Sequence, residues 1–168
     1  MLLPGDWYGP QAPLLHYATL LLARRGRCVH RVEWPDPAPA AGEVGPLVRA
    51  VLDGLDDDRP LVVAKSLGTC AMPLAVQRRL PGIWLTPVLD REPVASAVTR
   101  LPGTSLLVGG TADPLWDPTV ALRTDARVVE VTGGDHALED PDDEAASLAM
   151  LTTAVRAMAS FVDALDAR

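Results

Sequence analysis

The chain has 168 residues, a hydrophobic content of 48% and a formal net charge of −7. These values suit one domain, residues 1–168, with a buried core, and they exclude a disordered chain. The acidic balance argues against a nucleic-acid binder, and no apolar run reaches the roughly 18 residues of a membrane span. The first residues lack the pattern of a secretory signal, and two cysteines without a CxxC pair exclude a disulfide scaffold and a zinc site of that type. We therefore expect a soluble, cytoplasmic protein with no nucleic-acid or membrane partner.

Short apolar runs alternate along the chain with longer segments of helical periodicity. In chain order, we expect a strand at 1–3, a helix at 10–25, strands at 28–34 and 61–64 separated by a helix at 43–55, a helix at 67–80, a strand at 82–86, a short helix within 87–103, strands at 106–109 and 128–131, and a helix at 145–165. Apolar strands that alternate with helices predict an α/β fold with a mostly parallel sheet, covered by helices on both faces. The expected architecture is a three-layer sandwich with about six strands.

Residues that follow the carboxyl ends of parallel strands meet at one edge of such a sheet, where ligands bind. The sequence Val62-Val63-Ala64-Lys65-Ser66-Leu67-Gly68 takes a buried strand straight into a serine and then into a helix. A serine hydroxyl needs exposure, a base and an oxyanion site to act as a nucleophile, and a tight strand–turn–helix provides the exposure. The alternative, a purely structural role, is that Ser66 is an ordinary helix N-cap.

Two further segments place candidate catalytic residues at the same edge of the sheet. Asp113 and Asp117 follow the strand at 106–109, although an Asp-Pro pair in a loop is more often a turn or a helix cap. His136 follows the last strand after Gly133-Gly134, in a loop where a general base would lie. The other two histidines, His16 and His30, fall in a predicted helix and a predicted strand, which suits packing or surface roles.

The sequence around Ser66 resembles the nucleophile elbow of the α/β-hydrolase superfamily, with Ala64 in place of the first glycine of G-x-S-x-G. The resemblance covers nearly the whole chain. Ser66, Asp113 and His136 come in the order that this fold uses. It departs at the N-terminus, where the first two strands of the superfamily are not found. The remaining strands would lie in the order 2-1-3-4-5-6 of this chain.

The resemblance implies a role for each of these residues. His136 would take the Ser66 proton, and Asp113 would hold the imidazole, with Asp117 as the weaker candidate for that acid. The oxyanion donors would be the backbone N–H groups of Leu67 and of Asp6, with the N–H of Trp7 as the alternative to Asp6. The resemblance implies no cofactor and no metal.

Two tryptophans, Trp7 and Trp116, fall in the predicted active-site loops and could line a substrate pocket, whereas Trp84 falls in a strand and suits the core. The only lysine of the chain, Lys65, precedes the predicted nucleophile. It could serve as a cation near the loop that carries Asp113, or it could help to bind an acidic substrate. The favoured interpretation is that its side chain points away from the serine and pairs with a carboxylate. Cys70, one helical turn after Ser66, suits a small core residue better than a second nucleophile.

The interval 87–103 has room only for a very small lid, so we expect a shallow, open site. Such a site suits a small-molecule ester or thioester, or an acyl group presented by a carrier. The leading hypothesis is a serine esterase or thioesterase that acts through an acyl-enzyme. A non-catalytic binding or interaction protein with this fold is the second, because an aspartate at position 6 and an alanine at position 64 depart from the superfamily pattern. A Rossmann or flavodoxin-like nucleotide binder is a third, although the sequence has neither G-x-G-x-x-G nor a Walker A motif.

Overall fold

The structure is a computed structural model and describes residues 1–167. Its elements in chain order are β1 (Leu2–Leu3), α1 (Pro13–Ala23), α2 (Ala41–Asp53), β2 (Val62–Lys65), the 3₁₀ helix η1 (Ser66–Ala71), α3 (Met72–Arg78), β3 (Gly82–Leu85), α4 (Glu92–Val98), β4 (Ser105–Gly110), α5 (Pro118–Ala121), β5 (Arg127–Val131) and α6 (Glu144–Asp166). The strands form one sheet in the order β1-β2-β3-β4-β5, and every neighbouring pair is parallel. The α/β class expected from the sequence is confirmed.

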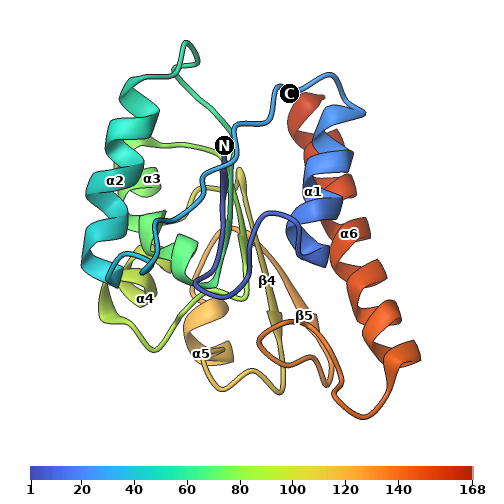
Figure 1. The fold of residues 1–168 in the computed structure, drawn as a ribbon. Coiled ribbons are helices and arrows are strands. Elements are labelled where there is room, and N and C mark those ends of the chain that lie inside the picture. The colour runs from blue at the N-terminus through green and yellow to red at the C-terminus, as the bar shows by residue number, and fades with distance from the viewer. Residues whose placement is uncertain (168) are drawn as a thin grey trace.

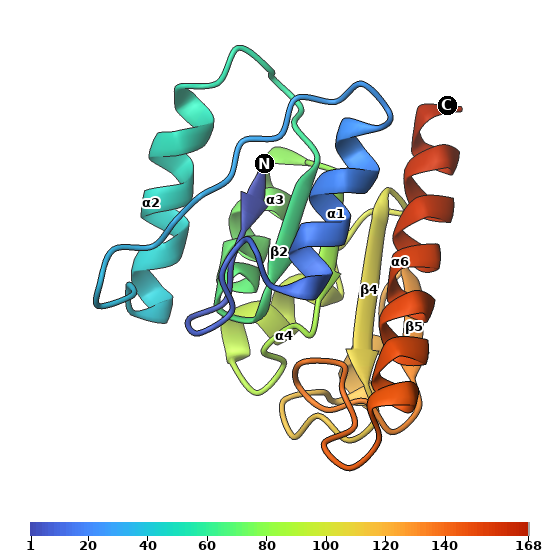
Figure 2. The ribbon, with the colours of Figure 1, turned by 45° about the vertical axis from the view of Figure 1, so that its right-hand side comes forward.

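Helices cover both faces of this sheet (Figures 1 and 2), which gives the expected three layers. Helices α1 and α6 pack side by side on one face, and α2, α3, α4 and α5 lie on the other. Along β2, Val63 belongs to the core beneath α1 and α6, whereas Val62 and Ala64 belong to the opposite core. The alternation follows from the two-residue period of a strand, because both faces of a covered parallel sheet are apolar.

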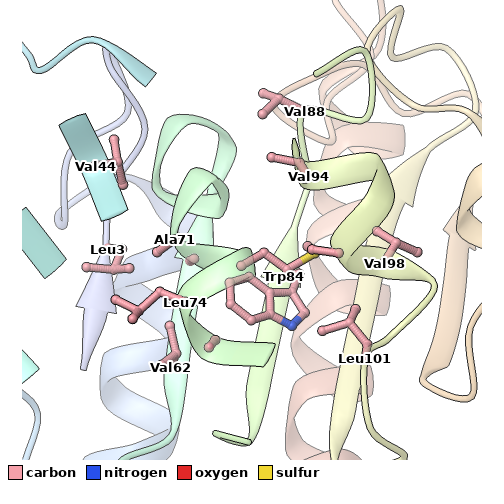
Figure 3. Packing of buried hydrophobic residues seen from close by; sticks show 14 of the residues in the cluster. Leu3, Val44, Val62, Ala71, Leu74, Trp84, Val88, Val94, Val98 and Leu101 are labelled. Carbon is pink, nitrogen blue, oxygen red and sulfur yellow. The ribbon is translucent and has the colours of Figure 1, made fainter. Parts of the chain in front are cut away.

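The core beneath α2, α3 and α4 is built around Trp84 of β3 (Figure 3). Its side chain is fully buried, as the sequence predicts, and packs among aliphatic residues from several elements, among them Leu74, Val98 and Leu101. The indole fits because position 82 of the same strand is a glycine, whose missing Cβ would otherwise lie 2.6 Å from the ring.

The strand predicted at 28–34 is the main error in the predicted elements. This segment runs beside β1, where Leu2 donates to the carbonyl of His30 and accepts from the N–H of Val32, but only Arg31 forms a parallel bridge. Because β1 has only two residues, it offers a partner no room for a longer ladder. The sheet therefore has five strands rather than about six, and this segment occupies the edge position beside β1 that the predicted order assigns to it.

The helix predicted at 67–80 begins as the 3₁₀ helix η1 and becomes the α-helix α3 only at Met72. Pro73 has no N–H to donate, and it therefore takes the first turn of α3, where that donor would be unpaired in any case. The interval 87–103 holds one short helix, α4, whose residues Val94, Ala97 and Val98 are buried in the core. Helix α4 is thus a covering helix of the sheet rather than a flap over its edge.

Helix α6 is long and apolar enough to cross a membrane by length and composition alone. In the structure, one side of it is buried against the sheet through Ala154, Ala157, Met158, Phe161 and Val162. Core packing accounts for the apolar residues on this side, whereas Leu148 is exposed.

Replacing Gly68 with alanine should lower the free energy of unfolding by about 1–3 kcal/mol, because overpacking at a rigid contact strains the backbone. The added Cβ would lie 2.8 Å from both Cβ and the carbonyl oxygen of Leu3 and 2.9 Å from the carbonyl oxygen of Pro4. Gly42→Ala in α2 is the matched control, since nothing beyond its chain neighbours lies within 4 Å of its Cβ position. That variant should be more stable than the wild type by up to about 1 kcal/mol, as expected for glycine replaced in a helix. Urea unfolding followed by circular dichroism measures both, and a Gly68→Ala protein as stable as the wild type would contradict the tight contact.

Candidate active site

Ser66 lies in a strained turn between β2 and η1. Its φ of 51° is left-handed, a conformation that costs a non-glycine residue on the order of 1–3 kcal/mol and is concentrated at functional sites. The turn is possible because small residues flank it: Ala64 is fully buried in the strand, and Gly68 passes against β1 and donates its N–H to the carbonyl of Pro4 at 3.1 Å. The turn has the left-handed backbone expected of a nucleophile elbow, whereas an ordinary N-cap has an extended backbone, and it leaves the serine partly exposed.

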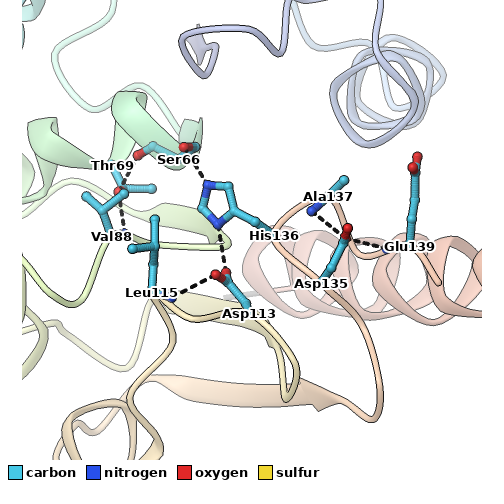
Figure 4. A network of polar contacts seen from close by, with 9 residues as sticks. All are labelled: Ser66, Thr69, Val88, Asp113, Leu115, Asp135, His136, Ala137 and Glu139. Atoms are coloured by element: carbon cyan, nitrogen blue, oxygen red, sulfur yellow. Dashed lines mark hydrogen bonds and ion pairs between the residues drawn. The ribbon is translucent and has the colours of Figure 1, made fainter. Parts of the chain in front are cut away.

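The structure brings Ser66, His136 and Asp113 together in a hydrogen-bonded series (Figure 4). Oγ of Ser66 lies 2.7 Å from Nε2 of His136, and Nδ1 of the same ring lies 2.8 Å from Oδ2 of Asp113. The carboxylate of Asp113 can only accept, so the Nδ1 proton is assigned to the imidazole and Nε2 is left to accept from the serine. The side chain of Asp113 is fully buried, whereas that of His136 is 30% exposed.

The two aspartates in the loop after β4 have different roles. Asp113 also accepts the N–H of Leu115 at 2.9 Å through Oδ1, so both of its oxygens are engaged. Asp117 instead caps helix α5 by accepting the N–H groups of Thr119 and Val120. The hydroxyl and N–H of Thr119 hold the pKa of the Asp117 carboxyl below its usual range, as expected for a capping carboxylate.

Backbone contacts fix the loop after β4 that carries Asp113 (the acid loop) to the loop after β5 that carries His136 (the base loop). The N–H of Ala112 donates to the carbonyl of Gly134 at 3.0 Å, and the N–H of Thr111 donates to the carbonyl of Val131. Position 110 must be glycine, because a Cβ there would overlap the carbonyl group of Gly134. His136 and Asp113 are thus held at hydrogen-bonding distance by the loops that carry them.

Asp135 organises the base loop, although no role was predicted for it from the sequence. Its Oδ1 accepts the N–H groups of Ala137 at 2.7 Å and Glu139 at 2.9 Å (Figure 4). An aspartate that accepts the N–H two residues later is a recurrent turn signal, so Asp135-His136-Ala137 could have been identified from the sequence. Thr69 is a second residue without an assigned role: its hydroxyl donates to the carbonyl of Ser66 at 2.5 Å and accepts the N–H of Val88.

The loop after β1 lies beside the elbow. Gly5 donates its N–H to the carbonyl of Tyr8 at 3.0 Å, which closes a turn over residues 5–8. This bond commits the N–H of Gly5, so Asp6 and Trp7 remain the candidate donors to an oxyanion from this loop. Leu67 lies in the first turn of η1, where an N–H has no partner within the helix. The side chain of Asp6 is exposed to solvent.

The structure separates the two tryptophans predicted to contact substrate. Trp7 is 97% exposed and lines a cavity of about 490 Å³ together with Gly5, Asp6 and Trp34. Trp116 is instead buried in the core, contrary to the expectation, because its ring stacks on Gly109 of β4 and its Nε1 donates to Glu130. A loop position close to the acid therefore did not place the side chain at the site.

The structure assigns no catalytic role to Lys65 or Cys70, which lie close to Ser66 in the sequence. Lys65 is 3% exposed and lies on the sheet face of α1 and α6, and within residues 1–167 it forms no ion pair, contrary to the pairing that the sequence analysis favoured. Burial raises the pKa of the Cys70 thiol, which makes it a poorer nucleophile, and its side chain packs on the core. Across residues 1–167, no group of three or more histidine, cysteine, aspartate or glutamate side chains is placed to hold a metal ion.

No protein-family model and no curated protein matches the sequence. Solved structures do match. A candidate hydrolase of the α/β superfamily from Xanthomonas campestris shares 19% identity over 97% of this chain and 96% of that one, with a TM-score of 0.70. A serine hydrolase without a lid from the same organism shares 17% identity over 98% of this chain and 80% of that one, with a TM-score of 0.68. A CIB-like hydrolase from Thermoplasma acidophilum shares 15% identity over 95% and 84%, also with a TM-score of 0.68. At these identities the likeness concerns the fold, and the chain has the α/β-hydrolase fold.

Proposed function

We propose that this protein is a serine hydrolase that cleaves small esters or thioesters through an acyl-enzyme. The observation that carries the proposal is the hydrogen-bonded series from Ser66 through His136 to Asp113, with distances of 2.7 and 2.8 Å. A buried carboxylate, an imidazole and a serine in a strained turn at one sheet edge form the arrangement that activates a serine hydroxyl.

In the first half of the reaction, Nε2 of His136 takes the Ser66 proton as Oγ attacks the carbonyl carbon of the substrate. Asp113 keeps the proton of the ring on Nδ1 and stabilises the imidazolium that forms. The imidazolium then returns its proton to the departing alcohol or thiol, which leaves an acyl group on Ser66. In the second half, His136 takes a proton from water as the water oxygen attacks the acyl carbonyl carbon. The imidazolium then returns this proton to Oγ of Ser66 as the acyl C–O bond breaks, which releases the acid and regenerates the serine.

The negative charge that develops on the substrate oxygen needs donors that are already in place. We assign these to the N–H of Leu67 and the N–H of Asp6, with Trp7 as the alternative to Asp6. Each such donor contributes about 10²–10³ in turnover. The Asp6 carboxylate is exposed, and water therefore screens its charge, which reduces its repulsion of an oxyanion.

The surroundings of Ser66 suit a small substrate. A cavity of about 490 Å³ lies beside the loop after β1; Ser66 does not line it, but Gly5 does, and the Cβ position of Gly5 lies 3.3 Å from Cβ of Ser66. Trp7 and Trp34 supply apolar surface there. Helix α4, the only helix between β3 and β4, is packed on the sheet. A small acyl group, or one presented by a carrier, fits this open site better than a long chain that needs enclosure.

The second candidate is a non-catalytic binding protein with this fold, and the observation that favours it is the aspartate in the oxyanion loop. A fluorophosphonate probe, which reacts with activated serines, separates the two. Under the enzyme proposal, the wild-type protein is labelled at Ser66, and Ser66→Ala is not. Ser96→Ala in helix α4 is the matched control and should label as the wild type does. A folded wild-type protein that resists labelling would support the binding protein instead.

Asp113→Asn tests the series without emptying the buried position. The asparagine oxygen can still accept from Leu115, but its amide group then faces Nδ1 and forces the imidazole into the tautomer that cannot take the serine proton. Hydrolysis of a nitrophenyl ester should fall by about 10⁴, while circular dichroism stays unchanged. Asp117→Asn, which removes only a charge at the cap of α5, should leave turnover within about threefold, since one weakened cap costs about 1 kcal/mol of stability. Equal losses in the two variants would contradict the assigned roles.

A further inference from the structure

Lys65 is a buried cation that the proposed mechanism does not use. It ends β2, immediately before Ser66, and only 3% of its surface is exposed. A lysine is almost never buried unless it is paired, because its charge must leave water. Within residues 1–167, no carboxylate lies within ion-pairing distance of it. A desolvated, unpaired ammonium beside a candidate nucleophile calls for another partner.

That partner is the ring of Tyr8. Nζ of Lys65 lies 4.6 Å from the ring centroid, well within the range of a cation–π contact. Tyr8 is held from the other side as well, because its hydroxyl accepts the N–H of Leu14 in the first turn of α1 at 3.0 Å. The ring is therefore fixed between the end of β2 and the start of α1.

Tyr8 is also the last residue of the turn closed by the bond from Gly5 to Tyr8. At the other end of this turn, a Cβ on Gly5 would lie 3.1 Å from Cβ of Tyr8, 3.3 Å from Cβ of Ser66 and 3.4 Å from Cδ of Lys65. The turn thus passes between the serine and the lysine stem without spare room. Asp6 and Trp7 lie between the two ends of this turn, so we expect a displacement of Tyr8 to move them as well.

We propose that Lys65 is a positioning residue, whose ammonium group on the Tyr8 ring fixes the turn over residues 5–8 and with it the oxyanion donor beside Ser66. This inference rests on the proposed function for its effect on turnover, but the clamp itself is a property of the fold. The carboxylates of Asp113, Asp135 and Glu139 also attract the Lys65 ammonium at long range. This attraction offsets part of the cost of burying its charge.

Four variants separate the charge of Lys65 from its bulk and the ring of Tyr8 from its hydroxyl. Lys65→Met keeps an unbranched apolar stem without the charge, and Lys65→Arg keeps the charge. Tyr8→Leu removes the ring, and Tyr8→Phe keeps it. With a nitrophenyl ester, Lys65→Met and Tyr8→Leu should lower kcat by about ten- to a hundredfold with KM nearly unchanged, less than the loss of a whole donor. Lys65→Arg should stay near the wild type, and Tyr8→Phe, which keeps the ring but loses its bond to Leu14, should lose less than Tyr8→Leu.

Exchange of the Gly5 amide hydrogen, which is bonded to the carbonyl of Tyr8, gives a readout that does not depend on activity. This exchange should speed up at least tenfold in Lys65→Met and Tyr8→Leu, stay unchanged in Lys65→Arg, and speed up less in Tyr8→Phe than in Tyr8→Leu. If no form of the protein hydrolyses esters but exchange follows this pattern, the proposed function fails and the clamp stands. If Lys65→Met exchanges and turns over as the wild type does, the clamp is wrong. Tyr8→Leu decides the matter in the same way should Lys65→Met not fold.

The pH dependence of kcat follows from the titration of Lys65. Burial lowers the pKa of Lys65 to about 8, against the pull of the carboxylates of Asp113, Asp135 and Glu139. Above pH 8 the ammonium is lost, so the cation–π contact weakens and kcat of the wild type should fall as the pH rises from 8 to 10. Lys65→Arg should keep its kcat over this range, and Lys65→Met should show a low kcat throughout. Burial raises the pKa of Tyr8 to about 12, so the titration of Tyr8 does not account for the same fall.

Stability over the same pH range is an independent check on this titration. An unfolded lysine keeps its proton up to about pH 10.5, whereas folded Lys65 loses it near 8. Between these values the unfolded state binds more protons, so resistance to urea should increase from pH 8 to 10. Lys65→Met should lack this increase. A wild-type protein whose urea midpoint and kcat have the same pH dependence as those of Lys65→Met would overturn the proposal.

Discussion

The site depends on the close passage of the elbow against the first strand. Because Gly68 has no side chain, its backbone lies against Leu3 and donates to the carbonyl of Pro4, and this contact lets the chain leave β2 with the left-handed φ of Ser66. Everything else at the edge is arranged around that turn. The buried central strands β2, β3 and β4 supply the rigidity that holds one strained residue, since strain of this kind persists only where the surroundings determine it.

A second constraint links the acid to the base. The loops after β4 and β5 are joined through backbone bonds and through the absence of a Cβ at Gly110, so Asp113 and His136 do not depend on side-chain contacts alone for their spacing. Asp135 rigidifies the base loop by accepting two N–H groups. The same edge contains a buried lysine for which residues 1–167 provide no ion-pair partner. A charge kept there at a cost in stability is typical of a functional site, where local stability is often sacrificed.

The features that could be predicted from the sequence are those with a local signal. Apolar runs identified the strands β2 to β5, and the order of Ser66, Asp113 and His136 along the chain identified the residues that the fold brings together. The strand expected at 28–34 did not form because its partner β1 has only two residues, and a local pattern does not reveal the length of a partner. Trp116 entered the core because Gly109 leaves room for its ring, and the pairing of Lys65 with an aromatic ring depends on a loop far away in sequence. Contacts of this kind are set by tertiary packing, which no single segment reports.

The central claim is that Ser66 carries an acyl group during turnover. Mixing the protein with nitrophenyl acetate in a stopped-flow instrument measures this directly, with acid quenching and mass analysis of the peptide that contains Ser66. We expect an initial burst of nitrophenol equivalent to the protein concentration and an acetyl group on Ser66 that disappears as substrate is consumed. A slow linear release with no acetyl group on that peptide, in a protein that is folded, would contradict it.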